Sequence, residues 1–193
     1  MILDSIGNYS VVLASKSPRR QELLKGMGVP FTCVTKETPE DYPEMPFDEV
    51  PAYLSLQKSL AFSDAELPAN YLLITADTVV IAEDMILGKP KDRDEALRML
   101  QTLSGKTHRV VTGVTVRSSV KRKTFAVTSK VTFARLDPKE MAYYVDYYKP
   151  YDKAGAYGIQ EWIGYVGITG LHGSFYNVMG LPTRRLYQTL KSF

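Results

Sequence analysis

Two adjacent arginines stand where a helix is expected to begin. An apolar run, VVLA, predicts a buried strand, and after it Ser17 suits a helix N-cap and Pro18 the first helical position. Cations are unfavourable at a helix N-terminus, which already carries partial positive charge. Free backbone N–H groups, the Ser15 hydroxyl and the guanidinium groups of Arg19 and Arg20 could together bind a phosphate. The alternative is that both arginines lie on a solvated face.

A second polar residue interrupts the apolar segment YLLITADTVVIA. This residue is Asp77, and a buried carboxylate is costly unless it is paired or bound to a cation. At a strand end it could hold a divalent metal or accept a proton from water, or it could make a structural hydrogen bond. Lys89, in the corner GKP, is a weaker candidate because a turn lysine is normally solvated. The glycine-rich stretch 152–160, DKAGAYGIQ, would let backbone approach a ligand closely, or it is a plain connection.

Composition narrows the class of protein that carries these residues. The chain has 193 residues, 45% hydrophobic and 23% charged, and its net charge of +3 does not favour general binding of nucleic acid or membranes. Cys33 is the single cysteine and is expected in the core, so neither an intrachain disulfide nor a cysteine-based metal site is expected. We see no secretory signal and no apolar run of membrane-spanning length, and we expect a cytoplasmic protein.

Hydrophobic periodicity predicts strands and helices that alternate along the chain, typical of a mixed α/β fold. Strands are expected at residues 11–14, 31–35, 71–82, 85–87, 108–117 and 124–135. Helices are expected from Ser17 to Gly26, over 50–61 and 92–104, from Asp137 to Pro150, and over 183–191. Residues 36–49 are expected to form an acidic, proline-rich loop, and the segment from Ile163 to Pro182 to be strand-like. Without repeats or a flexible linker, residues 1–193 are interpreted as one domain, with two lobes around a cleft.

Six motifs in this order resemble the Maf family of nucleoside triphosphate pyrophosphatases: LASKSPRR, TADTVV, GKP, LSGKTHRVVTGV, DKAGAYGIQ and NVMGLP. The resemblance extends from residue 11 to about residue 190. It implies a mixed elongated sheet flanked by helices, similar to the inosine triphosphate pyrophosphatases. The implied reaction is metal-dependent hydrolysis between the α- and β-phosphates, with Mg²⁺ or Mn²⁺ as the divalent cation and a nucleoside monophosphate and pyrophosphate as products.

The resemblance also implies roles for single residues. Asp77 matches the proton acceptor and lies near the metal, which Glu40 helps to hold; Asp41 could share that role, since the loop reads TPEDYP. The phosphate-binding positions correspond to Ser15, Arg20, Lys58 and Lys89.

Three positions decide the branch of the family. Arg19, Thr78 and Gln160 match the specificity positions of the branch that acts on dTTP and UTP. The branch that acts on 7-methyl-GTP carries a Trp before its arginine, a Gln after the Asp and a Glu near the later loop, and none of these occurs here. We therefore expect dTTP and UTP as substrates, with modified pyrimidine triphosphates as further ones and 7-methyl-GTP or another aberrant nucleotide as the alternative.

A different class of function stays open: a non-catalytic regulator of cell division that binds nucleotides or nucleic acid. Asp77 separates the two, because a hydrolase needs a carboxylate among phosphate-binding cations and a binding protein does not. The expected partner is a nucleoside triphosphate, with neither a membrane nor a stable nucleic-acid partner. The tyrosine-rich segment 143–148, YYVDYY, offers either a packing face or a surface for a homodimer.

Overall fold

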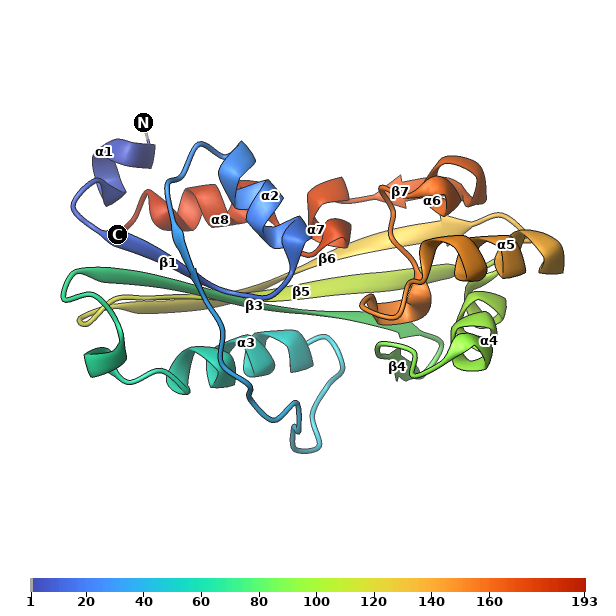
Figure 1. The fold of residues 1–193 in the computed structure, drawn as a ribbon, viewed down its shortest axis with the longest axis horizontal. Coiled ribbons are helices and arrows are strands. Elements are labelled where there is room, and N and C mark those ends of the chain that lie inside the picture. The colour runs from blue at the N-terminus through green and yellow to red at the C-terminus, as the bar shows by residue number, and fades with distance from the viewer. Residues whose placement is uncertain (1) are drawn as a thin grey trace. The chain divides into compact units, whose positions relative to one another are not determined.

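The computed structural model describes residues 2–193, and Figure 1 shows their fold. The chain divides into two compact units. The first unit comprises the chain up to Asp77 together with Thr112–Val127 and Gly180–Phe193, and the second comprises Thr78–Val111 and Thr128–Met179. Three strands therefore begin in one unit and end in the other. The two predicted lobes correspond to these units, whereas the predicted cleft between them and the single domain over 1–193 stay predictions.

A mixed sheet supplies the framework of both units. Its strands are β1 (Ser10–Ala14), β2 (Thr32–Val34), β3 (Tyr71–Ala82), β4 (Met85–Leu87), β5 (Thr107–Arg117), β6 (Arg122–Phe133) and β7 (Ile168–His172). Their order is β2-β1-β3-β5-β6-β7, and β4 pairs with β3. The β1 strand runs parallel to β2 and β3, whereas β4 and β7 are antiparallel to β3 and β6. The predicted mixed α/β class is confirmed.

Helices cover both faces of the sheet in the first unit. They are α1 (Ile2–Ile6), α2 (Pro18–Gly26), α3 (Val50–Leu60), the 3₁₀ helix η1 (Asp64–Glu66) and α8 (Thr183–Leu190). Figure 1 shows α3 on one face of the strands and α2 with α8 on the other. The apolar side chains of β3 are buried along almost the whole strand, as expected for a strand with helices on both faces.

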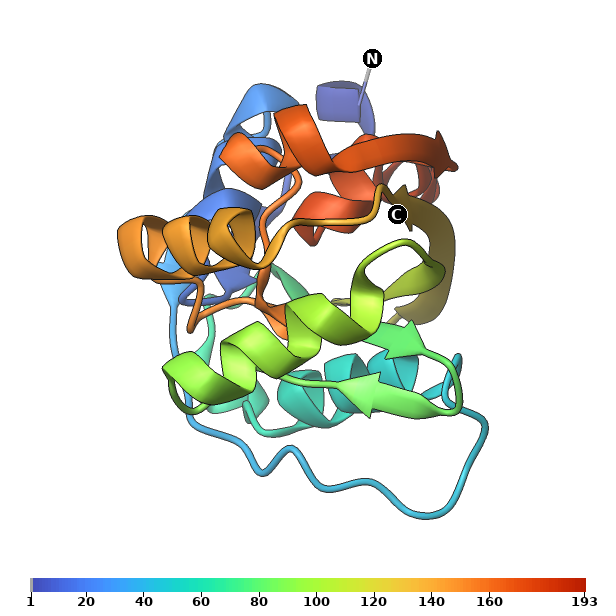
Figure 2. The same cartoon turned by 90° about the vertical axis from the view of Figure 1, so that its right-hand side faces the viewer.

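The second unit holds α4 (Arg93–Leu103), α5 (Pro138–Tyr148), the 3₁₀ helix η2 (Ala154–Ala156), α6 (Trp162–Gly167) and α7 (Phe175–Met179). Figure 2 shows α4, in light green, beside α5, in orange. At the start of α4 the Asp92 side chain accepts a hydrogen bond from the Glu95 N–H, and at the start of α5 Asp137 forms a capping box with Glu140.

The predicted strand-like segment from Ile163 to Pro182 is largely wrong, because β7 is flanked there by two short helices, α6 and α7. Two glycines let α6 pack closely on other segments: a side chain on Gly164 would overlap the Ile159 carbonyl oxygen, and one on Gly167 would press on Leu136. Cys33 is exposed rather than in the core, since it lies on the short strand β2 at the edge of the sheet.

Among the described residues, no helix combines the length and the apolar character that a membrane span requires.

Candidate functional site

The start of α2 is built around two serine hydroxyls. The backbone N–H of Ser17 donates to Ser15 Oγ at 3.1 Å, and the N–H of Arg20 donates to Ser17 Oγ at 3.5 Å. These bonds confirm the predicted N-cap at Ser17 and tie the corner after β1 to the first turn of the helix. Ser15 is 8% exposed, so its hydroxyl is part of the packed corner rather than of an open loop.

The sheet register brings this corner to the level of Asp77. Ala14, the last residue of β1, pairs with Thr75 of the parallel strand β3. Ser15 directly follows Ala14, and Asp77 lies two residues after Thr75 on β3. Asp77 is 8% exposed. A hydroxyl at a helix N-terminus and a buried carboxylate thus come from neighbouring strands at corresponding heights.

Arg20 extends from the same corner, and both its backbone and its side chain donate hydrogen bonds. Its Nε donates to the Gly180 carbonyl at 2.8 Å. Burial lowers the pKa of its guanidinium, the negative charges of Asp77 and Glu40 raise it, and the positive charge of Arg19 lowers it. The charges of both carboxylates are therefore felt at Arg20, which places two anionic and two cationic side chains in one electrostatic neighbourhood.

Lys58 joins the two carboxylates. Its Nζ donates to Asp77 Oδ1 in a short hydrogen bond and to Glu40 Oε1 at 3.2 Å. The side chains of Lys58 and Asp77 are 20% and 12% exposed, whereas that of Glu40 is 57% exposed. In the described part of the chain the structure records no corresponding contact for Asp41, which is exposed. The acidic loop thus contributes Glu40, while α3 and β3 hold the other two residues.

Hydrogen bonds fix α3 in the register that this contact needs. The Thr75 hydroxyl donates to the Ser55 carbonyl at 2.6 Å, and Ser55 Oγ lies 3.0 Å from Thr115 Oγ1. One helical turn beyond Ser55 stands Lys58, and the next residue on the same face of β3 beyond Thr75 is Asp77. The pair separated by 19 positions in sequence is therefore set by buried hydroxyls next to it.

A glycine on β5 lets α3 begin directly on the sheet. A side chain on Gly113 would overlap the carbonyl carbon of Pro51 and the nitrogen of Ala52. The close approach of strand and helix backbones is the physical requirement behind this glycine in the GKTHRVVTGV motif.

In the second unit the GKP corner and the glycine-rich loop meet. The Gly155 N–H donates to the Gly88 carbonyl at 3.0 Å, next to Lys89. Gly155 has φ +69°, and a side chain there would press on Val80 of β3 at 3.0 Å. The loop thus packs closely on residues of its own unit, its approach to a ligand stays a prediction, and Lys89 is exposed.

The end of the same loop carries Gln160 beside a partly buried ion-pair network. Lys153 Nζ lies 3.0 Å from Glu161 Oε1 and 2.8 Å from Asp152 Oδ1. The Tyr144 hydroxyl donates to Glu161 and accepts from the Gly158 N–H at 2.9 Å. Gln160 Oε1 itself is buried and accepts no hydrogen bond from the described residues.

Sequence reasoning missed Glu161 and Tyr144, which fix the loop. Burial raises the pKa of the Tyr144 hydroxyl, and its hydrogen bond to Glu161 raises it further, so the hydroxyl stays a proton donor to that carboxylate. The position of Glu161 directly after Gln160 was the sequence signal that could have identified it. Nothing in the tyrosine-rich segment distinguished Tyr144 from its exposed neighbours Tyr143 and Tyr147.

The carboxylates that could hold a divalent cation are two, Asp77 and Glu40, and both reach one ammonium group. Within residues 2–193 no group of three or more His, Cys, Asp or Glu side chains is placed to hold a metal. Two carboxylates suit Mg²⁺, which is commonly held by one or two carboxylates together with substrate phosphates and water. The residues therefore fit a cation that arrives with a phosphorylated substrate.

Comparison with known proteins finds relatives of full length. The chain is 52% identical over 195 residues to a dTTP/UTP pyrophosphatase of Porphyromonas gingivalis, covering 100% of this chain and 98% of the relative. It is 48% identical to a dTTP/UTP pyrophosphatase of Parabacteroides distasonis, with 100% of both chains covered. A solved structure of a nucleoside-triphosphatase / dITP/XTP pyrophosphatase from Mycobacterium abscessus aligns with a TM-score of 0.39 and 11% identity, covering 66% of this chain and 75% of that one.

Residues 10–193 match the sequence model of the family described as Maf-like protein. That range includes the serine corner of α2, the Lys58–Asp77 pair and the Gln160 loop. The chain therefore belongs to the Maf family.

Proposed function

We propose that this protein hydrolyses dTTP and UTP to the nucleoside monophosphate and pyrophosphate, and thereby removes unwanted pyrimidine triphosphates from the nucleotide pool. The observation that carries the proposal is the contact of the Asp77 carboxylate with Lys58, in the electrostatic neighbourhood of Arg20. A carboxylate amid phosphate-binding groups is what a phosphoanhydride hydrolase needs. The full-length identity to relatives named dTTP/UTP pyrophosphatase supports the same activity.

The reaction requires positioning, charge neutralisation and an activated water. Ser15, Arg20 and Lys58 would bind phosphate oxygens from the first unit, and Lys89 from the second. Asp77 would accept the proton of the attacking water as general base. The guanidinium of Arg20 suits this role because its fork donates to two oxygens at once, and its hydrogen bond to Gly180 fixes its orientation.

A divalent cation, Mg²⁺ or Mn²⁺, would be held by Asp77 and Glu40. When bound, such a cation neutralises phosphate charge and makes a nearby water more acidic. We place Glu40 rather than Asp41 in this role because its carboxylate already shares Lys58 with Asp77.

Arg19, Thr78 and Gln160 would select the base. Thymine and uracil both present an N3–H donor, whereas the corresponding nitrogen of cytosine is an acceptor. The buried oxygen of Gln160, which accepts no hydrogen bond from the described residues, suits a donor of this kind. A buried acceptor that faces another acceptor is costly, so cytosine triphosphates would be rejected.

The exposed free cysteine suits the cytoplasm, where we place this activity.

Pyrophosphate release tests the proposal. The purified protein is supplied with Mg²⁺ or Mn²⁺ and each of the eight standard triphosphates, with 7-methyl-GTP as a ninth substrate. We expect release from dTTP and UTP above the rest. Release confined to a purine or to 7-methyl-GTP would keep the reaction and contradict the assignment of Arg19, Thr78 and Gln160.

The variant Asp77→Asn tests the general base. It should keep dTTP binding and lose about 10²–10⁴-fold in turnover, the range typical of a lost general base. Asp84→Asn, in the exposed turn after β3, is the matched control and should keep full turnover. Full turnover in Asp77→Asn would refute the mechanism. No pyrophosphate from any triphosphate, with binding retained, would favour the regulatory nucleotide-binding function instead.

A further inference from the structure

The four residues from Gly158 to Glu161 form a tight turn, and Gln160 stands at its third position. The Glu161 N–H donates to the Gly158 carbonyl at 3.0 Å, which closes the turn. Ile159, the second residue, is 6% exposed, and a side chain on Gly164 of α6 would overlap its carbonyl oxygen. The backbone on either side of Gln160 is therefore held by specific contacts.

One hydroxyl, that of Tyr144 on α5, connects the two ends of this turn. It accepts a hydrogen bond from the Gly158 N–H at 2.9 Å and donates one to the Glu161 carboxylate. Tyr144 is fully buried, and its ring stacks on that of Tyr148 with 5.1 Å between the ring centres. The position of the bridging hydroxyl is therefore set by the packing of α5 and not by the loop itself.

Glu161 stands at the cap position of α6, but its carboxylate serves the turn. It makes no side-chain hydrogen bond to the helix that follows it. Its oxygens instead contact the Tyr144 hydroxyl and the Lys153 ammonium group, the latter at 3.0 Å. A side chain on Gly158 would come within 3.0 Å of Glu161 and of Lys153. The ion pair thus packs directly against the first residue of the turn.

These contacts leave the side-chain oxygen of Gln160 as an unused acceptor of the turn. Gln160 Oε1 is buried and accepts no hydrogen bond from the described residues. An unpaired buried acceptor is unfavourable, and a ligand that donates a hydrogen bond to it removes that penalty. Paired buried charges are weak evidence for stability, because apolar side chains often serve a core equally well. A fully bonded polar network can, however, fix one conformation.

We propose that Tyr144 and Glu161 are positioning residues for base selection, which hold the two ends of the turn and thereby fix the Gln160 amide where it meets the base. This inference rests on the proposed function, in which Gln160 accepts a hydrogen bond from N3–H of thymine or uracil. Neither positioning residue touches the substrate.

A fixed turn matters because an amide carries both kinds of hydrogen-bonding group. Its oxygen is an acceptor, which suits N3–H of thymine and uracil, whereas its NH₂ group is a donor, which suits the acceptor nitrogen of cytosine. If the turn moves, the amide of Gln160 can rotate and present its NH₂ group to the base. Loss of the contacts that hold the turn should therefore weaken the binding of thymine nucleotides and strengthen that of cytosine nucleotides relative to them.

The experiment compares the binding of two nucleotides by the full chain in the presence of Mg²⁺. The probes are the α,β-imido analogues of dTTP and dCTP, in which nitrogen replaces the bridging oxygen of the bond to be cleaved. Isothermal titration calorimetry gives the two dissociation constants, and their ratio measures base selection without turnover. Wild type should prefer the dTTP analogue. Partial unfolding of a variant lowers the number of binding sites for both analogues and leaves the ratio unchanged.

Two substitutions act on the two ends of the turn. Tyr144→Phe removes the bridging hydroxyl and keeps the ring, and it should reduce the preference for the dTTP analogue at least about tenfold. Glu161→Ala removes the carboxylate that accepts from this hydroxyl and should reduce the preference similarly. Glu161→Gln keeps an oxygen that can accept from the Tyr144 hydroxyl, so it should restore most of the preference.

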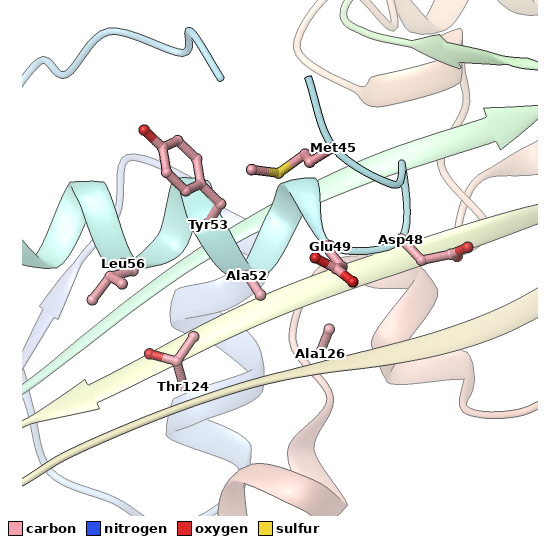
Figure 3. Close-up of a pocket in the computed structure, with 8 residues that line it drawn as sticks. All are labelled: Met45, Asp48, Glu49, Ala52, Tyr53, Leu56, Thr124 and Ala126. Atoms are coloured by element: carbon pink, nitrogen blue, oxygen red, sulfur yellow. The ribbon is translucent and has the colours of Figure 1, made fainter. Parts of the chain in front are cut away.

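Two matched controls each remove one tyrosine hydroxyl elsewhere. Tyr147→Phe changes an exposed tyrosine of the same helix, α5. Tyr53→Phe changes a tyrosine of the first unit that lines an apolar groove, and Figure 3 shows its hydroxyl directed away from Ala52 and Thr124. Both controls should keep the wild-type preference.

A double-mutant cycle tests whether the effect of Tyr144 passes through Gln160. Gln160→Ala removes the amide, so the preference for the dTTP analogue should fall. Tyr144→Phe should then cause no further fall in the double variant Tyr144→Phe/Gln160→Ala, because the group that it positions is already absent.

A wild type that binds neither analogue, or both equally, would overturn the inference. So would a Tyr144→Phe variant that keeps the wild-type preference, or one whose effect is undiminished when Gln160 is already alanine. If Tyr144→Phe does not fold, the preference of Glu161→Ala decides in the same way. Hydrolysis is tested separately by pyrophosphate release from wild type, so a failure of the proposed reaction is distinguished from a failure of this inference.

Discussion

Low pH should decrease the free energy of unfolding of this protein because of one buried histidine, His108. His108, on β5, is 2% exposed, its ring stacks on Phe133, and its Nε2 lies 2.7 Å from the Tyr157 hydroxyl. Its Nδ1 has no partner among the described residues. Burial lowers the pKa of His108 to about 4 from its ordinary value of 6.5. Protonation would place an uncompensated charge beneath Tyr157, in the loop that carries Gln160.

The sign and the size of this change in the free energy of unfolding follow from proton binding at His108. Between pH 6.5 and 4 the unfolded chain binds a proton at residue 108 that the folded chain does not, so the free energy of unfolding falls as the pH falls. A difference of about 2.5 pKa units corresponds to about 3 kcal/mol over the full range. From pH 7.5 the loss should reach about 1.4 kcal/mol at pH 5.5 and about 2.5 kcal/mol at pH 4.5. Urea unfolding at these three pH values measures it.

Two variants isolate the contribution of His108. In His108→Phe the loss between pH 7.5 and 4.5 should be smaller than in wild type by about 2.5 kcal/mol, although the hydrogen bond to Tyr157 is also lost. His172→Gln changes the exposed histidine and should keep the wild-type pH dependence. If His108→Phe and wild type lose the same stability over this range, the reasoning from burial is refuted.

Three further changes test the framework and the base preference. Gly113→Ala should destabilise by about 1–3 kcal/mol in urea unfolding, because α3 must move away from β5, whereas Gly26→Ala, which meets nothing within 4 Å, should be neutral or slightly stabilising. Gln160→Glu should change the ratio of pyrophosphate release from dTTP to that from the other triphosphates; an unchanged ratio removes Gln160 from base selection. Asp137→Ala should lower the free energy of unfolding by about 1 kcal/mol through the lost cap of α5, and an unchanged urea midpoint would show that the cap is dispensable.

Local signals predicted the elements that carry the site. Ser17 with Pro18 identified the start of α2, and the apolar segment around Asp77 identified β3. These patterns work because a cap and a buried strand depend on residues that are adjacent in sequence. The segment after Ile163 failed for the opposite reason: its glycines are required by contacts with distant residues such as Leu136 and Phe133, and glycine alone does not reveal such contacts.

The contacts within the site could not be read from local patterns. Lys58 looked like an ordinary exposed lysine, because nothing near it in sequence indicates that Asp77 lies within hydrogen-bonding distance. The contact depends on Thr75 and Ser55, whose hydrogen bond fixes the register of α3 on β3. Only the resemblance to the Maf family singled out Lys58 and Glu40 before the structure, and their roles in phosphate and metal binding stay predictions.

The number of donors on Lys58 explains why a lysine suits this position. An ammonium group has three N–H donors, and here two of them are directed to Asp77 and Glu40. The third can donate to a phosphate oxygen while the first two stay in place. Lys58 could thus hold the general base and the substrate at once, whereas an arginine, with its planar fork, would fix one carboxylate in a bidentate pair. In the proposed mechanism the same cation that orients Asp77 would also bring the phosphates to it.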